Sequence, residues 1–113
     1  MPTYVEIPRP VQKQIKKLGR KYPSLTHELS DLIAQLKEDE RPGDKIPGVG
    51  YDVYKDRLAN PSAQRGKSGG FRVIYYIKTE TNIILVYIYS KSDQTDISSE
   101  VIRSVIDEIP PTS

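Results

Sequence analysis

The sequence contains no cysteine, and its only histidine is His27. The absence of cysteine excludes disulfide bridges and thiolate metal ligands. A single histidine excludes a paired-histidine acid–base site and leaves no ligand set for a zinc cluster. His27 lies beside Glu28, away from the apolar stripe of its predicted helix. We therefore expect an exposed surface residue without a catalytic role.

Long apolar segments are also missing. The N-terminus has no apolar run of signal-peptide length, and no segment is long enough to cross a membrane. We therefore expect no membrane partner and a cytoplasmic protein. The chain has 113 residues, of which 36% are hydrophobic and 28% charged. This length and composition predict one globular domain, residues 1–113.

The formal net charge is only +2, but the charges are distributed unevenly. Acidic residues gather in segments 37–44 and 93–108, whereas the middle of the chain is basic. Its basic residues are Lys55, Arg57, Arg65, Lys67, Arg72, Lys78 and Lys91, against the acids Asp56 and Glu80. This distribution favours an anion-binding face, although a solvated surface of mixed charge explains the composition equally well.

Two segments rich in β-branched and aromatic residues, Phe71–Ile77 and Ile83–Tyr89, predict adjacent strands joined by a polar turn over 78–82. Both segments carry apolar side chains on both faces, which is typical of central strands covered on each side. Arg72 interrupts the first segment, and a charge there needs an anion, a partner or solvent. We expect a third strand over Tyr51–Leu58 and a short edge strand over Thr3–Ile7.

Apolar residues at helical spacing predict three helices. The first begins near Pro10, the second follows a cap at Ser24, and the last begins at Ser98 or Ser99. Together these elements predict an α+β fold, with a small antiparallel sheet packed by an N-terminal helical hairpin and a C-terminal helix. The lysines and arginines of the first helix either extend the anion-binding face or form a solvated surface, and we favour the latter.

Two familiar motifs are excluded by their context. Arg65–Ser68 is similar to the end of a nucleotide-binding P-loop, but Pro61 stands where that motif needs glycine, and a strand follows instead of a helix. Four aspartates could form acid–base pairs, but helix capping and surface charge explain them, so we expect no carboxylate hydrolase. These are Asp52, Asp56, Asp93 and Asp96.

The remaining constellation is cationic. Arginine presents a planar fork that fits phosphate oxygens, lysine supplies a compact charge, and tyrosine rings can stack on unpaired bases. Cations on several strands of one sheet face would form a phosphate site. Its candidates are Lys55, Arg57, Arg65, Lys67, Arg72 and Lys91, with Tyr75, Tyr76, Tyr87 and Tyr89 nearby in the sequence. Tyrosines in central strands are, however, more often part of the core.

The run GKSGGFRVIYY over 66–76 is followed by Leu85–Lys91 and then by Asp96-Ile97-Ser98. In these segments the chain resembles the RelE/ParE toxin superfamily, and within it the RelE-type HigB branch. The resemblance covers nearly the whole chain and implies a RelE-like α+β fold. It also implies the toxin of a type II toxin–antitoxin pair, an mRNA interferase that enters the ribosomal A site and needs no metal or cofactor.

In such toxins the 2′-hydroxyl of the RNA attacks the adjacent phosphate. Carried over by position, the resemblance assigns Arg72 to the scissile phosphate. Lys55 and Arg57 match two cations on the preceding strand, with Lys55 the better candidate base, and Lys91 would serve the leaving group. Arg65 and Lys67 would hold flanking phosphates or ribosomal RNA, and Tyr89 would stack on the substrate. A cognate antitoxin should neutralise this basic surface.

The chain departs from its relatives at two positions. Ser92 stands where some of them have an arginine, and their substrate-stacking tyrosine falls near Ser98. Two alternatives therefore stay open. One is a ParE-like inhibitor of DNA gyrase without nuclease activity, since a shared fold does not decide function. The other is a degenerate toxin that acts only as a binding module in an antitoxin complex.

Overall fold

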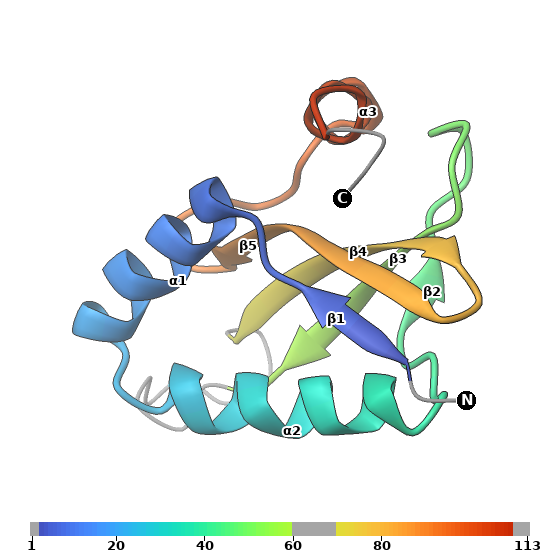
Figure 1. Ribbon diagram of the computed structural model, residues 1–113. Coiled ribbons are helices and arrows are strands. Elements are labelled where there is room, and N and C mark those ends of the chain that lie inside the picture. Colours follow the sequence, from blue (N-terminus) through green and yellow to red (C-terminus); the bar gives the residue numbers. More distant parts are fainter. Residues whose placement is uncertain (1–2, 60–69, 110–113) are drawn as a thin grey trace.

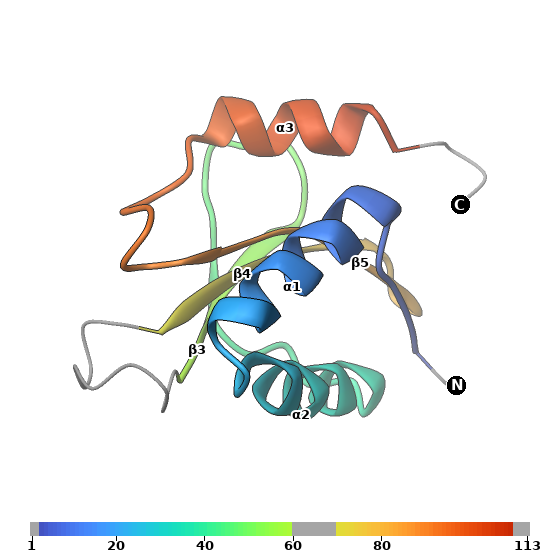
Figure 2. The same ribbon diagram turned by 90° about the vertical axis from the view of Figure 1, so that its left-hand side faces the viewer.

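Five strands form one sheet between helices in the computed structural model, which describes residues 3–59 and 70–109. The strand order is β1-β5-β4-β3-β2, and α3 lies on one side of the sheet while α2 lies on the other (Figures 1 and 2). The predicted α+β class is thus confirmed. The strands are β1 (Tyr4–Glu6), β2 (Asp44–Lys45), β3 (Val53–Leu58), β4 (Phe71–Thr79) and β5 (Asn82–Ser90), and the helices are α1 (Arg9–Lys21), α2 (Leu25–Lys37) and α3 (Ser99–Asp107).

We had predicted an antiparallel sheet, but the sheet is mixed. β3, β4 and β5 pair antiparallel, but β1 pairs parallel with β5. Most of the chain separates β1 from β5, so no tight turn fixes their relative direction. The two-residue strand β2 lies outside all the strands that we predicted, because two residues are too few to show a period.

The central strands are covered on both faces, as predicted. Phe71, Val73 and Tyr75 of β4 pack in one core with α1 and α2. Ile74 faces the opposite side and packs in a second core beneath α3. The other buried residues of this second core are Val49, Val53, Ile84, Val86, Ile102 and Ile106. Alternating side chains therefore serve two separate cores, one on each face of the sheet.

The two N-terminal helices form a V and do not run side by side as in the predicted hairpin (Figure 1). α2 crosses one face of the sheet, while α1 turns toward β5. β1 pairs only with residues 82–84 of β5, so the rest of that strand edge is left to α1. There the backbone N–H of Ile88 donates to Oε1 of Gln14 at 3.2 Å. A helix side chain thus replaces the missing strand partner.

The last helix is fixed at both ends. Oγ of Ser98 accepts a hydrogen bond from the backbone N–H of Val101 at 3.2 Å, which confirms the predicted cap. Farther along, Arg103 donates to the carbonyl oxygens of Val49 and Gly48, both at 2.7 Å. These contacts hold α3 over the second core. Within the described residues, no helix is long and apolar enough to span a membrane.

Candidate functional site

The strand register brings predicted site residues from three strands into one row. Arg57 of β3 pairs with Arg72 of β4, which in turn pairs with Tyr89 of β5. Directly opposed residues project on the same side of a sheet, and here that side is the one that α3 partly covers. Lys55 lies two residues before Arg57 and so projects on the same side. We call Lys55, Arg57, Arg72, Tyr89 and Lys91 the cation face.

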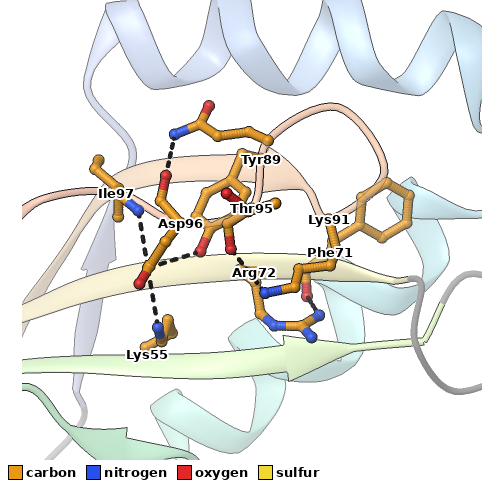
Figure 3. Close-up of polar contacts among 9 residues, drawn as sticks. Lys55, Phe71, Arg72, Tyr89, Lys91, Thr95, Asp96 and Ile97 are labelled. Carbon is orange, nitrogen blue, oxygen red and sulfur yellow. Dashed lines mark hydrogen bonds and ion pairs between the residues drawn. The ribbon is translucent and has the colours of Figure 1, made fainter.

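The carboxylate of Asp96 lies between Lys55 and Tyr89, at one side of this face (Figure 3). Oδ1 of Asp96 is 3.3 Å from Nζ of Lys55 and 3.5 Å from the hydroxyl of Tyr89, which donates to it. The same oxygen accepts the backbone N–H of Ile97 at 2.8 Å. This N–H and then the Lys55 ammonium lower the pKa of Asp96. The carboxylate is exposed to solvent and is therefore ionised at neutral pH.

The segment after β5 folds so that Asp96 reaches Lys55. The backbone N–H groups of Asp93 and Gln94 donate to the carbonyl of Ser90, both at 3.0 Å, and form a turn. Nζ of Lys91 donates to the carbonyl of Thr95 at 2.7 Å. Nε2 of Gln94 donates to the carbonyl of Asp96 at 2.8 Å. The predicted leaving-group residue Lys91 thus also braces the segment that carries Asp96 (Figure 3).

Arg72 follows two residues after Gly70, whose backbone lies close to that of Leu58 at the end of β3. Gly70 has φ +95°, and a Cβ there would lie 2.5 Å from the carbonyl oxygen of Leu58, so only glycine fits. Arg72 is half-buried, and its Nη1 donates to the carbonyl of Phe71 at 3.4 Å (Figure 3). Its guanidinium thus lies back along its own strand, toward the start of β4.

Tyr89 contributes its hydroxyl group to the cation face, whereas its ring is buried. The side chain is only 4% exposed, and its ring packs against Tyr87 with centroids 6.0 Å apart. Burial and then the negative charge of Asp96 raise the pKa of the Tyr89 phenol, so it stays protonated and donating. A ring this covered offers no face to a base in this conformation, and the half-buried Tyr87 is the more accessible of the pair.

Three predicted site residues remain, namely Arg57, Arg65 and Lys67. Arg57 is exposed and makes no ion pair within residues 3–59 and 70–109. Arg65 and Lys67 lie outside the described residues. In the described part of the chain, no three His, Cys, Asp or Glu side chains cluster closely enough to hold a metal ion.

Asp96 is the site residue that sequence reasoning missed. We had explained it as a cap or surface charge, and 41 residues separate it from Lys55. The only signal was its place in the Asp96-Ile97-Ser98 run that contributed to the family resemblance. No pattern within a single strand or helix indicates a contact across that distance.

Two comparisons with known proteins gave matches, one to the sequence and one to the fold. The sequence profile of the family described as the RelE toxin of the RelE / RelB toxin–antitoxin system matches residues 11–106. Among solved structures, a mutant of the E. coli toxin RelE in the free state, with two arginines replaced by alanine, superposes with a TM-score of 0.60. The alignment covers 97% of this chain and 100% of that chain, at 16% sequence identity, and so supports the fold alone. A search of curated proteins gave no match.

Proposed function

Because this chain belongs to the RelE toxin family of toxin–antitoxin systems, we propose that it is a ribosome-dependent endoribonuclease that cleaves mRNA in the ribosomal A site. The observation that carries this proposal is the row of Arg57, Arg72 and Tyr89 across three strands, with Lys55 and Lys91 beside it. Such a row offers several cationic donors to one phosphodiester group. RNA supplies its own nucleophile there, so the protein needs only to position the RNA and to stabilise the transition state.

In the proposed reaction, the 2′-oxygen bonds to the adjacent phosphorus while the bond from phosphorus to the 5′-oxygen breaks. The products are a 2′,3′-cyclic phosphate and a 5′-hydroxyl. One proton must leave the 2′-hydroxyl and another must reach the 5′-oxygen. Arg72 and Arg57 face the phosphate oxygens, whose negative charge grows in the transition state, and Lys91 protonates or stabilises the leaving oxygen. No metal or cofactor takes part in this scheme.

The ion pair between Lys55 and Asp96 changes the role that we assign to Lys55. The Asp96 carboxylate lies 3.3 Å from Nζ of Lys55, and an ionised carboxylate is a hydrogen-bond acceptor that can take up a proton. We therefore assign Lys55 as a further cation on the phosphate and the Asp96 carboxylate as the proton acceptor for the 2′-hydroxyl. Tyr89 orients this carboxylate through its hydroxyl.

The antitoxin that keeps such a toxin inactive should place acidic or hydrogen-bonding groups over the cation face. Cleavage of translated mRNA takes place in the cytoplasm, where we expect the protein to act. Within the RelE family we assign the chain to the HigB branch on the GKSGGFRVIYY run.

Expression of the toxin followed by primer extension on a translated mRNA tests the proposal. We expect new 5′ ends within codons of the translated frame, and none on the same mRNA with its start codon removed. Intact mRNA in arrested cells would contradict the proposal. Inhibition of DNA gyrase in a supercoiling assay would then indicate the ParE-like alternative.

A further inference from the structure

A second basic surface lies beside the cation face, where α1 packs on the edge of β5. A depression of about 600 Å³ lies between the side chains of α1 and the C-terminal half of β5, beyond the part of the strand edge that β1 covers. We call it the α1 groove. Lys17, Arg20 and Lys21 of α1 line one wall, and Tyr87 and Tyr89 of β5 line the other.

The charges of the α1 groove are mostly uncompensated. Nζ of Lys21 lies 3.0 Å from Oδ1 of Asp93, the only carboxylate in the lining. Lys17 and Arg20 are exposed, and their side chains make no ion pair or hydrogen bond within the described parts of the chain. After the single pairing, these two cations remain in the wall with no carboxylate partner among the described residues. Such a groove attracts a polyanion.

The α1 groove shares one residue, Tyr89, with the cation face. Tyr89 lines the groove and also donates to Asp96, and Tyr87 lines the groove two residues earlier on the same strand. One wall of the groove is therefore the strand that carries the last member of the reactive row. A chain bound at the cation face can continue around the segment 91–96 into the groove.

We propose that the α1 groove binds the single-stranded RNA that flanks the cleaved phosphodiester, with its phosphates on Lys17 and Arg20. This inference rests on the proposed function and extends it. Grooves for single strands combine cations that follow the phosphates with aromatic rings that accept a base, and half-buried Tyr87 supplies such a ring here. An acidic peptide would use the cations but would gain little from the ring.

A double variant with a matched control tests the α1 groove. Lys17→Gln with Arg20→Gln removes the two unpaired cations and keeps good helix formers. Lys13→Gln with Lys16→Gln removes two exposed charges from the same helix outside the groove lining. The probe is single-stranded RNA with 2′-fluoro groups, which cannot undergo attack by a 2′-hydroxyl. Fluorescence anisotropy measures its binding as a 4-mer and as a 12-mer, between 50 and 200 mM salt.

We expect the groove variant to bind the 12-mer about tenfold more weakly than the wild type, with a salt slope lower by about 1.4 for two lost phosphate contacts. Binding of the 4-mer and of the control variant should stay within about twofold of the wild-type values. Equal losses of RNA affinity in both double variants would overturn the inference. They would indicate that the overall charge of α1 attracts the RNA and that the groove does not bind it specifically. A groove variant that loses binding only to poly-glutamate would also overturn it, in favour of a peptide site.

The uncleavable probe separates this test from that of the proposed function. A wild-type protein that binds the 12-mer through the groove but leaves translated mRNA intact would contradict the nuclease and support the groove. Efficient cleavage with no effect of the groove substitutions would support the nuclease and overturn the groove. Circular dichroism melting of both double variants checks that they fold.

Discussion

Nζ of Lys55 lies 3.3 Å from Oδ1 of Asp96, although 41 residues separate the two in the chain. The pair joins β3 to the segment that leads into α3, across the open end of the sheet face. A carboxylate of the chain thus lies beside the cations of the proposed site. Both partners are accessible to solvent, so the pair adds little to stability, and its importance lies in which group carries the proton.

Removing the charge of Asp96 should separate binding from catalysis. We expect Asp96→Asn to lower kcat by about 10²–10³, the usual contribution of a general base. KM should stay the same or fall, because a negative charge no longer faces the phosphate. Single-turnover cleavage on programmed ribosomes measures both constants, with the exposed Asp31→Asn as control. A rise in KM at constant kcat would contradict the assignment.

Two substitutions at Lys55 distinguish a cation from a base. Arginine keeps the positive charge and does not lose its proton in proteins, whereas glutamine lacks the charge. If Lys55 acts as a cation, Lys55→Arg should retain cleavage within about tenfold, and Lys55→Gln should lose about 10²-fold. The same single-turnover assay measures both variants. Equal inactivity of the two would instead make Lys55 the base.

Arg72 should be the most sensitive cation. Arg72→Ala removes a donor aimed at the developing charge and should lower cleavage by about 10² or more. Arg72→Lys keeps the charge without the fork and should recover part of this loss. Primer extension on translated mRNA measures both, and Arg9→Ala, an exposed arginine on α1, is the control. Unchanged cleavage by a folded Arg72→Ala protein would exclude the proposed site.

The turn before β2 also supports the site. Gly43 has φ +91°, and a Cβ there would lie 2.3 Å from the backbone oxygen of Lys55. Gly43→Ala must therefore displace the strand that carries Lys55. We expect a loss of more than about 1 kcal/mol in unfolding free energy and a lower cleavage rate. Gly48→Ala is the matched control, because Gly48 also has a positive φ of +79° but nothing within 4 Å. Urea unfolding compares the two, and equal losses would exclude a clash at Lys55.

Asp56 gives a prediction for stability against pH. Burial raises the pKa of this half-buried carboxyl, with a smaller contribution from the charge of Asp44. The ionised form is thus disfavoured in the folded state. Asp56→Asn should stabilise the protein by roughly 0.5–1 kcal/mol at neutral pH. The gain should disappear as the pH falls through the raised folded pKa to below the unfolded value of about 3.9, where both states are protonated. Thermal unfolding between pH 3 and 8 measures this difference, and a gain that persists at pH 3 would contradict it.

Local patterns predicted the elements better than their arrangement. The alternation around Ile74 indicated a central strand, and its two cores confirm it. A cap at Ser98 or Ser99 was also predicted, and Ser98 provides it through a hydrogen bond that spans only three residues. Three features were not predicted. They are the parallel pairing of β1, the angle between α1 and α2, and the contact of Asp96 with Lys55. Each depends on packing between segments far apart in the chain, which leaves no period in the sequence.

The direct opposition of Arg57 and Arg72 has a thermodynamic consequence. Like charges facing each other across two strands repel, so the empty protein gives up stability to keep them there. Any polyanion that binds between them relieves this repulsion only in the folded state and should raise the melting temperature. The toxin should therefore be most heat-labile when it has neither RNA nor antitoxin, and added phosphate or sulfate should protect it in part.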